Sequence, residues 1–161
     1  MKRAAVFDES KKYRYSLYRE WDNSLPRILF IMLNPSTANH ETEDRTSRQC
    51  LYFSKKFGFG SFEIVNLYAY ISTDPKQLKV SDDPIGMKND VYILEAAKRA
   101  KTVVIAWGEK HLMKQRNKEI TKLVRENGHQ VYCLDVTKSG HPRHPSRLRH
   151  SIDSLKVFAA Y

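Results

Sequence analysis

Cysteine is scarce in this chain, and long apolar runs are absent from it. Only Cys50 and Cys133 occur among its 161 residues. Two cysteines are too few for a four-cysteine zinc or iron–sulfur site, and we expect both to be reduced thiols. No apolar run reaches the roughly 18 residues of a membrane helix, and residues 1–10 lack the apolar core of a signal peptide. We therefore expect a cytoplasmic protein with no membrane partner.

Acidic residues are also in the minority. The chain has 28 Lys and Arg residues against 18 Asp and Glu residues, which gives a net charge of +10. A field of this sign attracts polyanions. Several cations crowd one segment near the C-terminus, namely Lys138, Arg143, Arg147 and Arg149. The charge favours a nucleic acid or a nucleotide as partner, and a generally basic protein is the alternative.

Apolar runs and helical patterns alternate along the chain. Buried strands are expected at residues 28–33, 62–70, 102–107 and 129–136. Apolar spacing and terminal signals predict helices over 44–57, 86–100 and 110–127, with a last short helix within 147–159. The segment 13–21 alternates aromatic and polar residues and is expected to form a hairpin with the run 4–7.

This alternation predicts an α/β fold in one domain over residues 1–161. Its expected form is a three-layer αβα sandwich with a mostly parallel four-stranded core sheet and an added N-terminal β-hairpin. Ligands bind such sheets at the carboxyl ends of the strands. The residues delivered there are Asn34, Pro35, Ser36, Gly108, Glu109 and the loop 141–146. We expect these segments to converge on one crevice.

Asn66 lies inside the otherwise apolar run of residues 62–70. A buried amide must find partners or lose about 1–3 kcal/mol for each unpaired group. One interpretation is a structural asparagine that binds a nearby loop. The other is an amide that faces a planar hydrogen-bonding edge, such as that of a nucleobase.

The loop 141–146, His-Pro-Arg-His-Pro-Ser, holds two His-Pro pairs. Each proline fixes its own φ and restricts the residue before it, so the loop is stiff. A histidine held in this way can donate a hydrogen bond to a developing oxyanion, and a rigid structural turn is the alternative. A metal site at His141 and His144 lacks a third ligand at an obvious spacing, so we expect no metal and no other cofactor.

The chain resembles a bacterial and phage family known as domain of unknown function 1643. The shared stretches are ILFIMLNPSTA, IVNLYAY followed by TDP, PIGMKND, VVIAWG and TKSGHPRHPS. They extend from residue 13 to about residue 148. The family has no settled activity, so this resemblance implies no function.

More distantly, the chain resembles the uracil-DNA glycosylase superfamily, whose fold has a parallel four-stranded sheet between helices. In this resemblance Asn34 and Pro35 match a motif that positions water, Ser36 follows them in the pocket, and Asn66 matches the reader of the base edge. His144, Pro145 and Ser146 match the loop that stabilises the departing base. Leu148 matches the wedge that enters the duplex, and Arg143, Arg147 and Arg149 are then expected to hold phosphates of DNA.

The chain departs from that superfamily at three points. Arg147 replaces a proline after the His-Pro-Ser motif, Ser36 stands where a small glycine is common, and the aromatic residue that stacks on the base has no clear match beyond Tyr52 or Phe53.

Three functions remain open from the sequence. The first is a DNA glycosylase-like enzyme that flips and excises a base by N-glycosidic hydrolysis. The second is a nucleic-acid or nucleotide-binding module without turnover, and the third is an enzyme that acts on a small nucleotide or modified base. A metal-dependent hydrolase that uses Asp44, Asp83 or Glu109 is a further reading, although helix caps and turns explain these carboxylates more simply.

Overall fold

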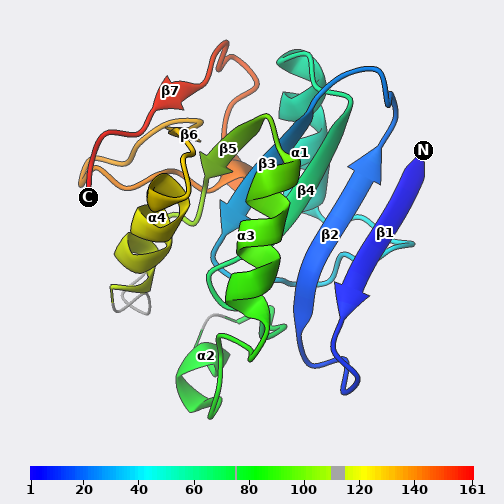
Figure 1. Cartoon of the computed structure of the whole chain (residues 1–161), viewed down its shortest axis with the longest axis vertical. Helices are drawn as coiled ribbons and strands as arrows, with labels where there is room; N and C mark the ends of the chain where they lie inside the picture. The colour runs from blue at the N-terminus through cyan, green and yellow to red at the C-terminus, as the bar shows by residue number, and fades with distance from the viewer. Residues whose placement is uncertain (75, 110–114) are drawn as a thin grey trace.

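A seven-stranded sheet runs through the protein, of which the computed structural model describes residues 1–74, 76–109 and 115–161 (Figure 1). The strands are β1 (Lys2–Phe7), β2 (Arg14–Glu20), β3 (Arg27–Met32), β4 (Ser61–Asn66), β5 (Thr102–Ile105), β6 (Val131–Cys133) and β7 (Lys156–Val157). Their order in the sheet is β1-β2-β4-β3-β5-β6-β7.

The middle of the sheet is parallel. Strands β4, β3, β5 and β6 run parallel to their neighbours, as expected for the four buried runs of the sequence. The hairpin of β1 and β2 is antiparallel, and β2 joins the sheet by antiparallel pairing with β4. The prediction of an α/β fold with an added hairpin is therefore confirmed, although the sheet has a further antiparallel strand, β7, on β6.

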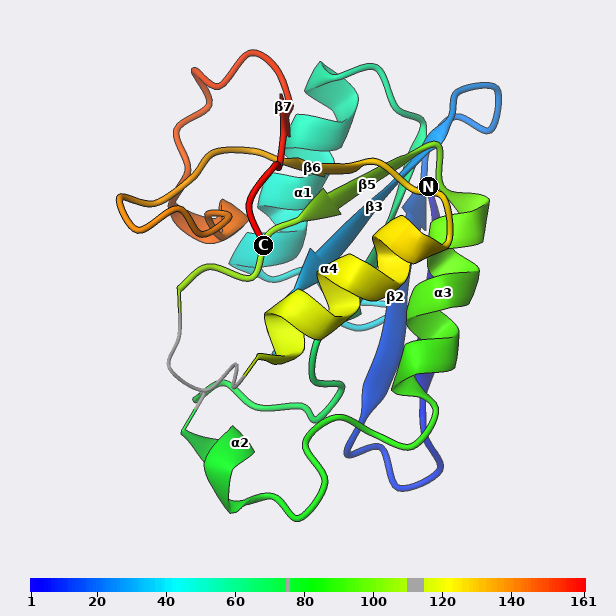
Figure 2. The ribbon, with the colours of Figure 1, turned by 60° about the vertical axis from the view of Figure 1, so that its left-hand side comes forward.

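Helices cover both faces of the sheet (Figure 2). They are α1 (Arg45–Lys56), α2 (Gln77–Val80), α3 (Asn89–Arg99) and α4 (Arg116–Glu126). An apolar core that includes Ile93 and Ile120 lies beneath α3 and α4, and a second core that includes Phe53 lies beneath α1. Because β3 is buried between both cores, its sequence RILFIM is almost continuously apolar.

Several expected boundaries are wrong. Strand β4 ends at Asn66 and β6 at Cys133, several residues before the predicted ends, and part of the helix predicted over 110–127 lies outside the described residues. The helix expected within 147–159 is not formed: a single turn at Pro145–Arg147 is followed by β7. The free edge of β6 explains this, since Lys156 and Val157 pair with it and place Phe158 in the core.

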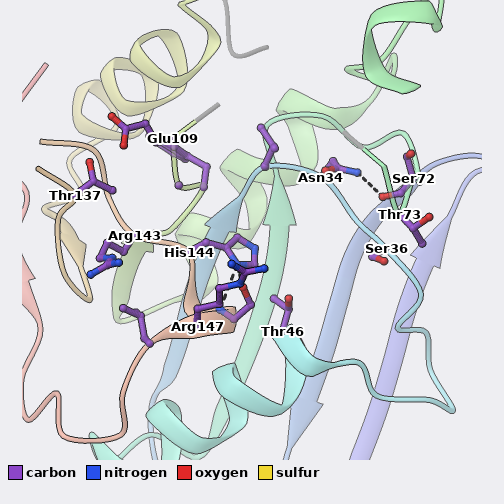
Figure 3. Close-up of a pocket in the computed structure, with 15 residues that line it drawn as sticks. Asn34, Ser36, Thr46, Ser72, Thr73, Glu109, Thr137, Arg143, His144 and Arg147 are labelled. Carbon is purple, nitrogen blue, oxygen red and sulfur yellow. Dashed lines mark hydrogen bonds between the residues drawn. The ribbon is translucent and has the colours of Figure 1, made fainter. Parts of the chain in front are cut away.

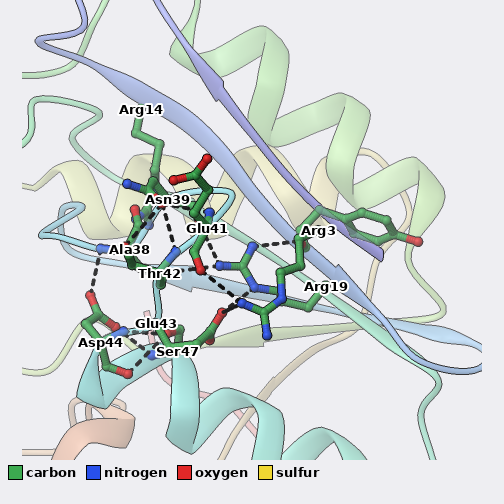
Figure 4. A network of polar contacts seen from close by, with 11 residues as sticks. Arg3, Arg14, Arg19, Ala38, Asn39, Glu41, Thr42, Glu43, Asp44 and Ser47 are labelled. Atoms are coloured by element: carbon green, nitrogen blue, oxygen red, sulfur yellow. Dashed lines mark hydrogen bonds and ion pairs between the residues drawn. The ribbon is translucent and has the colours of Figure 1, made fainter. Parts of the chain in front are cut away.

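The segment between β3 and α1 is fixed to β2 by a group that we call the polar clamp, made of Arg3, Arg19, Asn39 and Glu43 (Figure 4). The fully buried Arg19 forms an ion pair with Glu43 and donates to the Asn39 and Thr42 carbonyls. Arg3 donates to the Glu41 carbonyl at 3.0 Å. Next along the chain, Asp44 accepts the backbone N–H of Ser47 at 2.8 Å and caps α1, as its sequence position predicted.

Among the described residues, no helix has the length and apolar character needed to cross a membrane. Cys50 and Cys133 are both free thiols and both buried.

Candidate functional site

A pocket of about 480 Å³ lies at the carboxyl ends of the parallel strands. We call it the main pocket. Figure 3 shows Asn34, Ser36, Ser72 and Thr73 on one side of it and Glu109, Thr137 and Arg143 on the other, with His144 and Arg147 between them. The remaining lining residues are Leu33, Thr46, Trp107, Gly108, Ser146 and Leu148. Strand ends distant in the sequence therefore meet in one crevice, as the fold class predicts.

A smaller cavity of about 30 Å³ shares part of this lining, and we call it the recess. Four residues line both cavities, namely Asn34, Ser36, Thr46 and His144. The recess adds Asn66 and Pro35 from the sequence-predicted set, together with Arg14, Leu17, Met32, Ala38, Asp44 and Ile64. The sequence-predicted residues Asn34, Pro35, Ser36, Asn66 and His144 are thus brought together.

Asn66 is buried with an unpaired amide. Only 1% of the residue is exposed, and neither its Nδ2 nor its Oδ1 has a hydrogen-bond partner among the described residues. It shares a face of β4 with Phe62 and Ile64, both in the core beneath α1. The backbone carbonyl of Asn66 is occupied by Asn89, whose Nδ2 donates to it at 2.8 Å. An unpaired buried amide of this kind costs about 1–3 kcal/mol for each group, so Asn66 is a candidate ligand-binding residue.

Asn34 has a fixed orientation at the end of β3. Its Nδ2 donates to the Ser72 carbonyl at 2.9 Å and to the Pro35 carbonyl at 3.1 Å. These two bonds use the donor side of the amide. The carbonyl oxygen Oδ1 is then the group that Asn34 can offer to a water or a ligand as an acceptor.

His144 is held in one tautomer. Its Nδ1 accepts the backbone N–H of Ser146 at 3.2 Å and lies 2.9 Å from the Ser146 hydroxyl. Because a backbone N–H can only donate, Nδ1 carries no proton and the neutral ring is protonated at Nε2. His144 is therefore a hydrogen-bond donor in the wall of both cavities.

Two neighbouring elements hold the loop that carries His144. From α1, Gln49 donates to the Pro145 and Leu148 carbonyls, and Arg45 donates to the Ser146 carbonyl at 2.7 Å. After β5, Gly108 donates its backbone N–H to the Pro142 carbonyl at 2.8 Å. Gly108 has a φ of +77°, and a Cβ there would lie 3.4 Å from the Cβ of His144. Glycine suits this close approach because it adopts positive φ without strain.

The residues expected to contact nucleic acid divide into two groups. Arg143, Arg147 and Arg149 are exposed, and the first two line the main pocket, whereas Arg149 lines neither cavity. Leu148 is only 8% exposed and packs in the core beneath α1. The structure thus does not present Leu148 as a wedge, because its side chain is used for packing.

Arg14 is a site residue that the sequence analysis missed. It is 3% exposed, lines the recess, and donates to the Ala38 carbonyl at 2.8 Å. Its Nε has no partner among the described residues. Burial lowers the pKa of the Arg14 guanidinium from 12.5 to about 10, against the opposing charge of Asp44, so the side chain stays charged at neutral pH. Arg14 lies in the segment 13–21, whose alternation of aromatic and polar residues did not predict that the Arg14 side chain would be buried.

Trp107 was also missed as a lining residue. Its side chain is buried in the wall of the main pocket, and the indole N–H has no partner among the described residues. Its position at the end of a predicted strand, directly before Gly108, is the sequence feature that could have indicated a place in the pocket wall. Hydroxyl groups from Thr46, Ser72, Thr73 and Thr137 add further polar contacts that no motif indicated.

The other candidates lie elsewhere. Phe53 is fully buried, and Tyr52 stacks on His150 with ring centroids 3.6 Å apart. Neither residue lines the main pocket or the recess. His141 contacts the Tyr161 hydroxyl through Nδ1 at 2.8 Å. Within residues 1–74, 76–109 and 115–161, no cluster of three or more His, Cys, Asp or Glu residues is arranged to hold a metal ion.

A family described as "Protein of unknown function (DUF1643)" matches residues 14–146. The chain belongs to this family. The match agrees with the motifs that carried the resemblance in the sequence, and its range contains every residue that lines the recess. No curated protein and no solved structure matches the chain. The resemblance to uracil-DNA glycosylases therefore remains a prediction from the sequence.

Proposed function

We propose that the protein is a base-excising enzyme of uracil-DNA glycosylase type, which hydrolyses the N-glycosidic bond of a nucleobase in nucleic acid. The observation that carries this proposal is the buried, unpaired amide of Asn66 in a recess that Asn34 and His144 also line. The parallel strands β4, β3, β5 and β6 support the proposal, because the resemblance implies a parallel four-stranded sheet between helices.

The amide of Asn66 suits recognition of a base edge. A primary amide offers a donor and an acceptor side by side, which matches a ring that presents a carbonyl next to an N–H. The recess is too small for a ring, but the adjoining main pocket of about 480 Å³ can hold one with its sugar. The base then lies in the main pocket with its edge at Asn66.

Asn34 would position the attacking water. Its Oδ1 accepts a hydrogen bond from the water, whose oxygen bonds to C1′ of the sugar as the bond from C1′ to the base nitrogen breaks. The base leaves with the electron pair of that bond, and the water's proton passes to solvent or to the base. An amide is a weak base, so most of the rate enhancement must come from stabilising the departing base.

His144 is the group placed for that stabilisation. Its Nε2–H can donate to an oxygen of the base on which negative charge develops, and a preorganised donor of this kind typically contributes about 10²–10³ in turnover. The backbone N–H of Ser146 donates to Nδ1 at 3.2 Å, which puts the ring proton on Nε2, the atom assigned to this donation. In the wall of the main pocket, the exposed Arg143 and Arg147 would hold phosphates.

The buried Leu148 favours a second candidate, an enzyme that acts on a small nucleotide or modified base. An enzyme that opens a duplex needs a side chain to fill the gap left by the flipped base. The packing of Leu148 in the core leaves that role unfilled. Single strands and free nucleotides need no wedge, so the choice of substrate separates the two candidates.

The test is incubation with single-stranded and duplex oligonucleotides that carry uracil, mismatches or oxidised bases, together with the matching free nucleotides. Abasic sites and released base are measured for wild type, Asn66→Ala and His141→Ala. We expect release that Asn66→Ala makes less selective among bases, while His141→Ala, in the same loop but outside both cavities, behaves as wild type. Absence of release from every substrate would overturn the proposal and leave a binding module in its place.

A further inference from the structure

Three arginines are buried in the described part of the chain, and they differ in their partners. Arg19 pairs with Glu43, and Arg116 pairs with Asp90 at 2.5 Å. Arg14 forms no ion pair within the described residues, and its guanidinium donates to the neutral Ala38 carbonyl. A buried charge is costly unless it is paired, so Arg14 is the cation of this protein whose site calls for an anionic partner.

Asp44 forms no ion pair with Arg14 among the described residues. Asp44 also lines the recess, and its charge acts on Arg14. Its two carboxylate oxygens, however, accept backbone N–H groups, from Ser47 at 2.8 Å and from Ala38 at 3.3 Å. These bonds hold Asp44 as the cap of α1, and the Nε–H of Arg14 has no partner among the described residues.

The recess has the size of a small substituent. A volume of about 30 Å³ is enough for one or two water-sized groups. Arg14 supplies charge and a free N–H, and Asn66 supplies a free amide N–H, in the wall of this one cavity. Two donors and a positive charge are the features that bind a carboxylate, which accepts through both oxygens.

We propose that the recess is a subsite for a carboxylate carried on a planar ring, with Arg14 and Asn66 as its donors. The ring occupies the main pocket and directs the carboxylate past His144 into the recess. This inference rests on the proposed function for the identity of the ring as a nucleobase. Arg14 is then the residue that determines specificity, because it distinguishes an acidic ring from its neutral counterpart.

The first test uses formate, the smallest carboxylate, on the wild-type protein. Two-dimensional ¹H–¹⁵N spectra report the Arg Nε–H groups and the Asn66 amide, with Arg14 assigned by the signal that Arg14→Lys removes. We expect saturable shifts of the Arg14 and Asn66 signals, while Arg19, equally buried but paired with Glu43, serves as the internal control. Shifts of Arg19 or of exposed arginines alone would overturn the subsite.

The second test compares uracil with its 5- and 6-carboxylates by calorimetry at constant ionic strength. One carboxylate should bind about 10- to 100-fold more tightly than uracil, as expected for hydrogen bonds to a charged group. Arg14→Gln should abolish that preference. Arg48→Gln, which removes the same charge from the exposed surface of α1, should keep it.

Equal binding of all three rings, or a preference that survives Arg14→Gln, would overturn the inference. The formate experiment is read on the wild-type protein and uses Arg14→Lys only for assignment, so it stands even if Arg14→Gln fails to fold. Neither measurement depends on base release. Failure of the proposed function, seen as absence of released base, is therefore distinguishable from failure of the carboxylate subsite.

Discussion

The polar clamp and the recess both include residues of β2, and they differ in how many of their buried polar atoms have hydrogen-bond partners. In the polar clamp, the guanidinium of Arg19 donates to Glu43 and to the backbone carbonyls of Tyr18, Asn39 and Thr42. The one unpaired buried side-chain atom of the clamp, among the described residues, is Oε2 of Glu43. In the recess, Asn66 and Arg14 both keep unpaired groups. A satisfied network stabilises a fold, whereas unpaired groups retained at a cavity lower stability and indicate a ligand.

The largest effect should come from the clamp. Arg19→Met removes the buried partner of Glu43 and leaves it, among the described residues, only the longer ion pair with Arg3, at 3.9 Å. Breaking a buried pair typically costs about 3–5 kcal/mol. Arg14→Met removes one hydrogen bond and no ion pair, so its loss should be at most about 1.5 kcal/mol. Urea unfolding of the two variants measures the difference, and equal losses would contradict the contrast between the two regions.

The next effect concerns catalysis at the recess. If the proposed function holds, His144→Ala should lower turnover about 10²–10³-fold by removing one donor to the departing base. Affinity for nucleic acid should change little, because a neutral histidine attracts phosphate weakly. Single-turnover base release and equilibrium binding measure the two quantities, with His141→Ala as the matched control. Unchanged turnover in the His144→Ala variant would contradict the proposal that this loop stabilises the departing base.

Two buried asparagines allow hydrogen-bonded and unpaired polar groups to be compared by their effect on the free energy of unfolding. Asn89 donates to the carbonyls of Asn66 and Leu67, so Asn89→Leu should cost about 1–3 kcal/mol. Asn66→Leu replaces an amide that has no partner among the described residues, and it should leave the free energy of unfolding within about 1 kcal/mol of wild type or raise it. Chemical denaturation of both variants provides the check. A large loss for Asn66→Leu would indicate a structural partner rather than a ligand.

The sequence predicted the strands of the core because their pattern is local. An unbroken apolar run such as residues 28–33 indicates burial on both faces wherever it lies, and turn residues mark its end. The rule that ligands bind at strand ends then placed Asn34 and His144 in one crevice, and both line the main pocket and the recess.

The sequence did not predict Arg14, Leu148 or β7, because each depends on distant segments. Arg14 is buried by the segment around Ala38, which showed no pattern of its own. Leu148 is packed beneath α1, and the 156–157 strand forms only because β6 offers a free edge. Burial and pairing of this kind are set by tertiary contacts, which override local propensity.

The smallest effect should come from the exposed arginines, where each contact is screened by solvent. If Arg143 and Arg147 each neutralise one phosphate, log K for duplex DNA should fall with log salt at a slope of about −0.9 for each contact. Arg143→Ala and Arg147→Ala should each flatten that slope by about 0.9 and weaken binding similarly on all sequences.

The control variant is Lys122→Ala, which removes an exposed charge from α4. Helix α4 covers the face of the sheet opposite to that of α1, so this variant should leave the slope unchanged. Fluorescence anisotropy across a salt series measures all three variants. Neither arginine variant should alter unfolding, because both side chains are exposed, which separates this surface from the clamp. A slope that changes equally in all three variants would mean that nucleic acid responds to net charge alone and not to the rim of the main pocket.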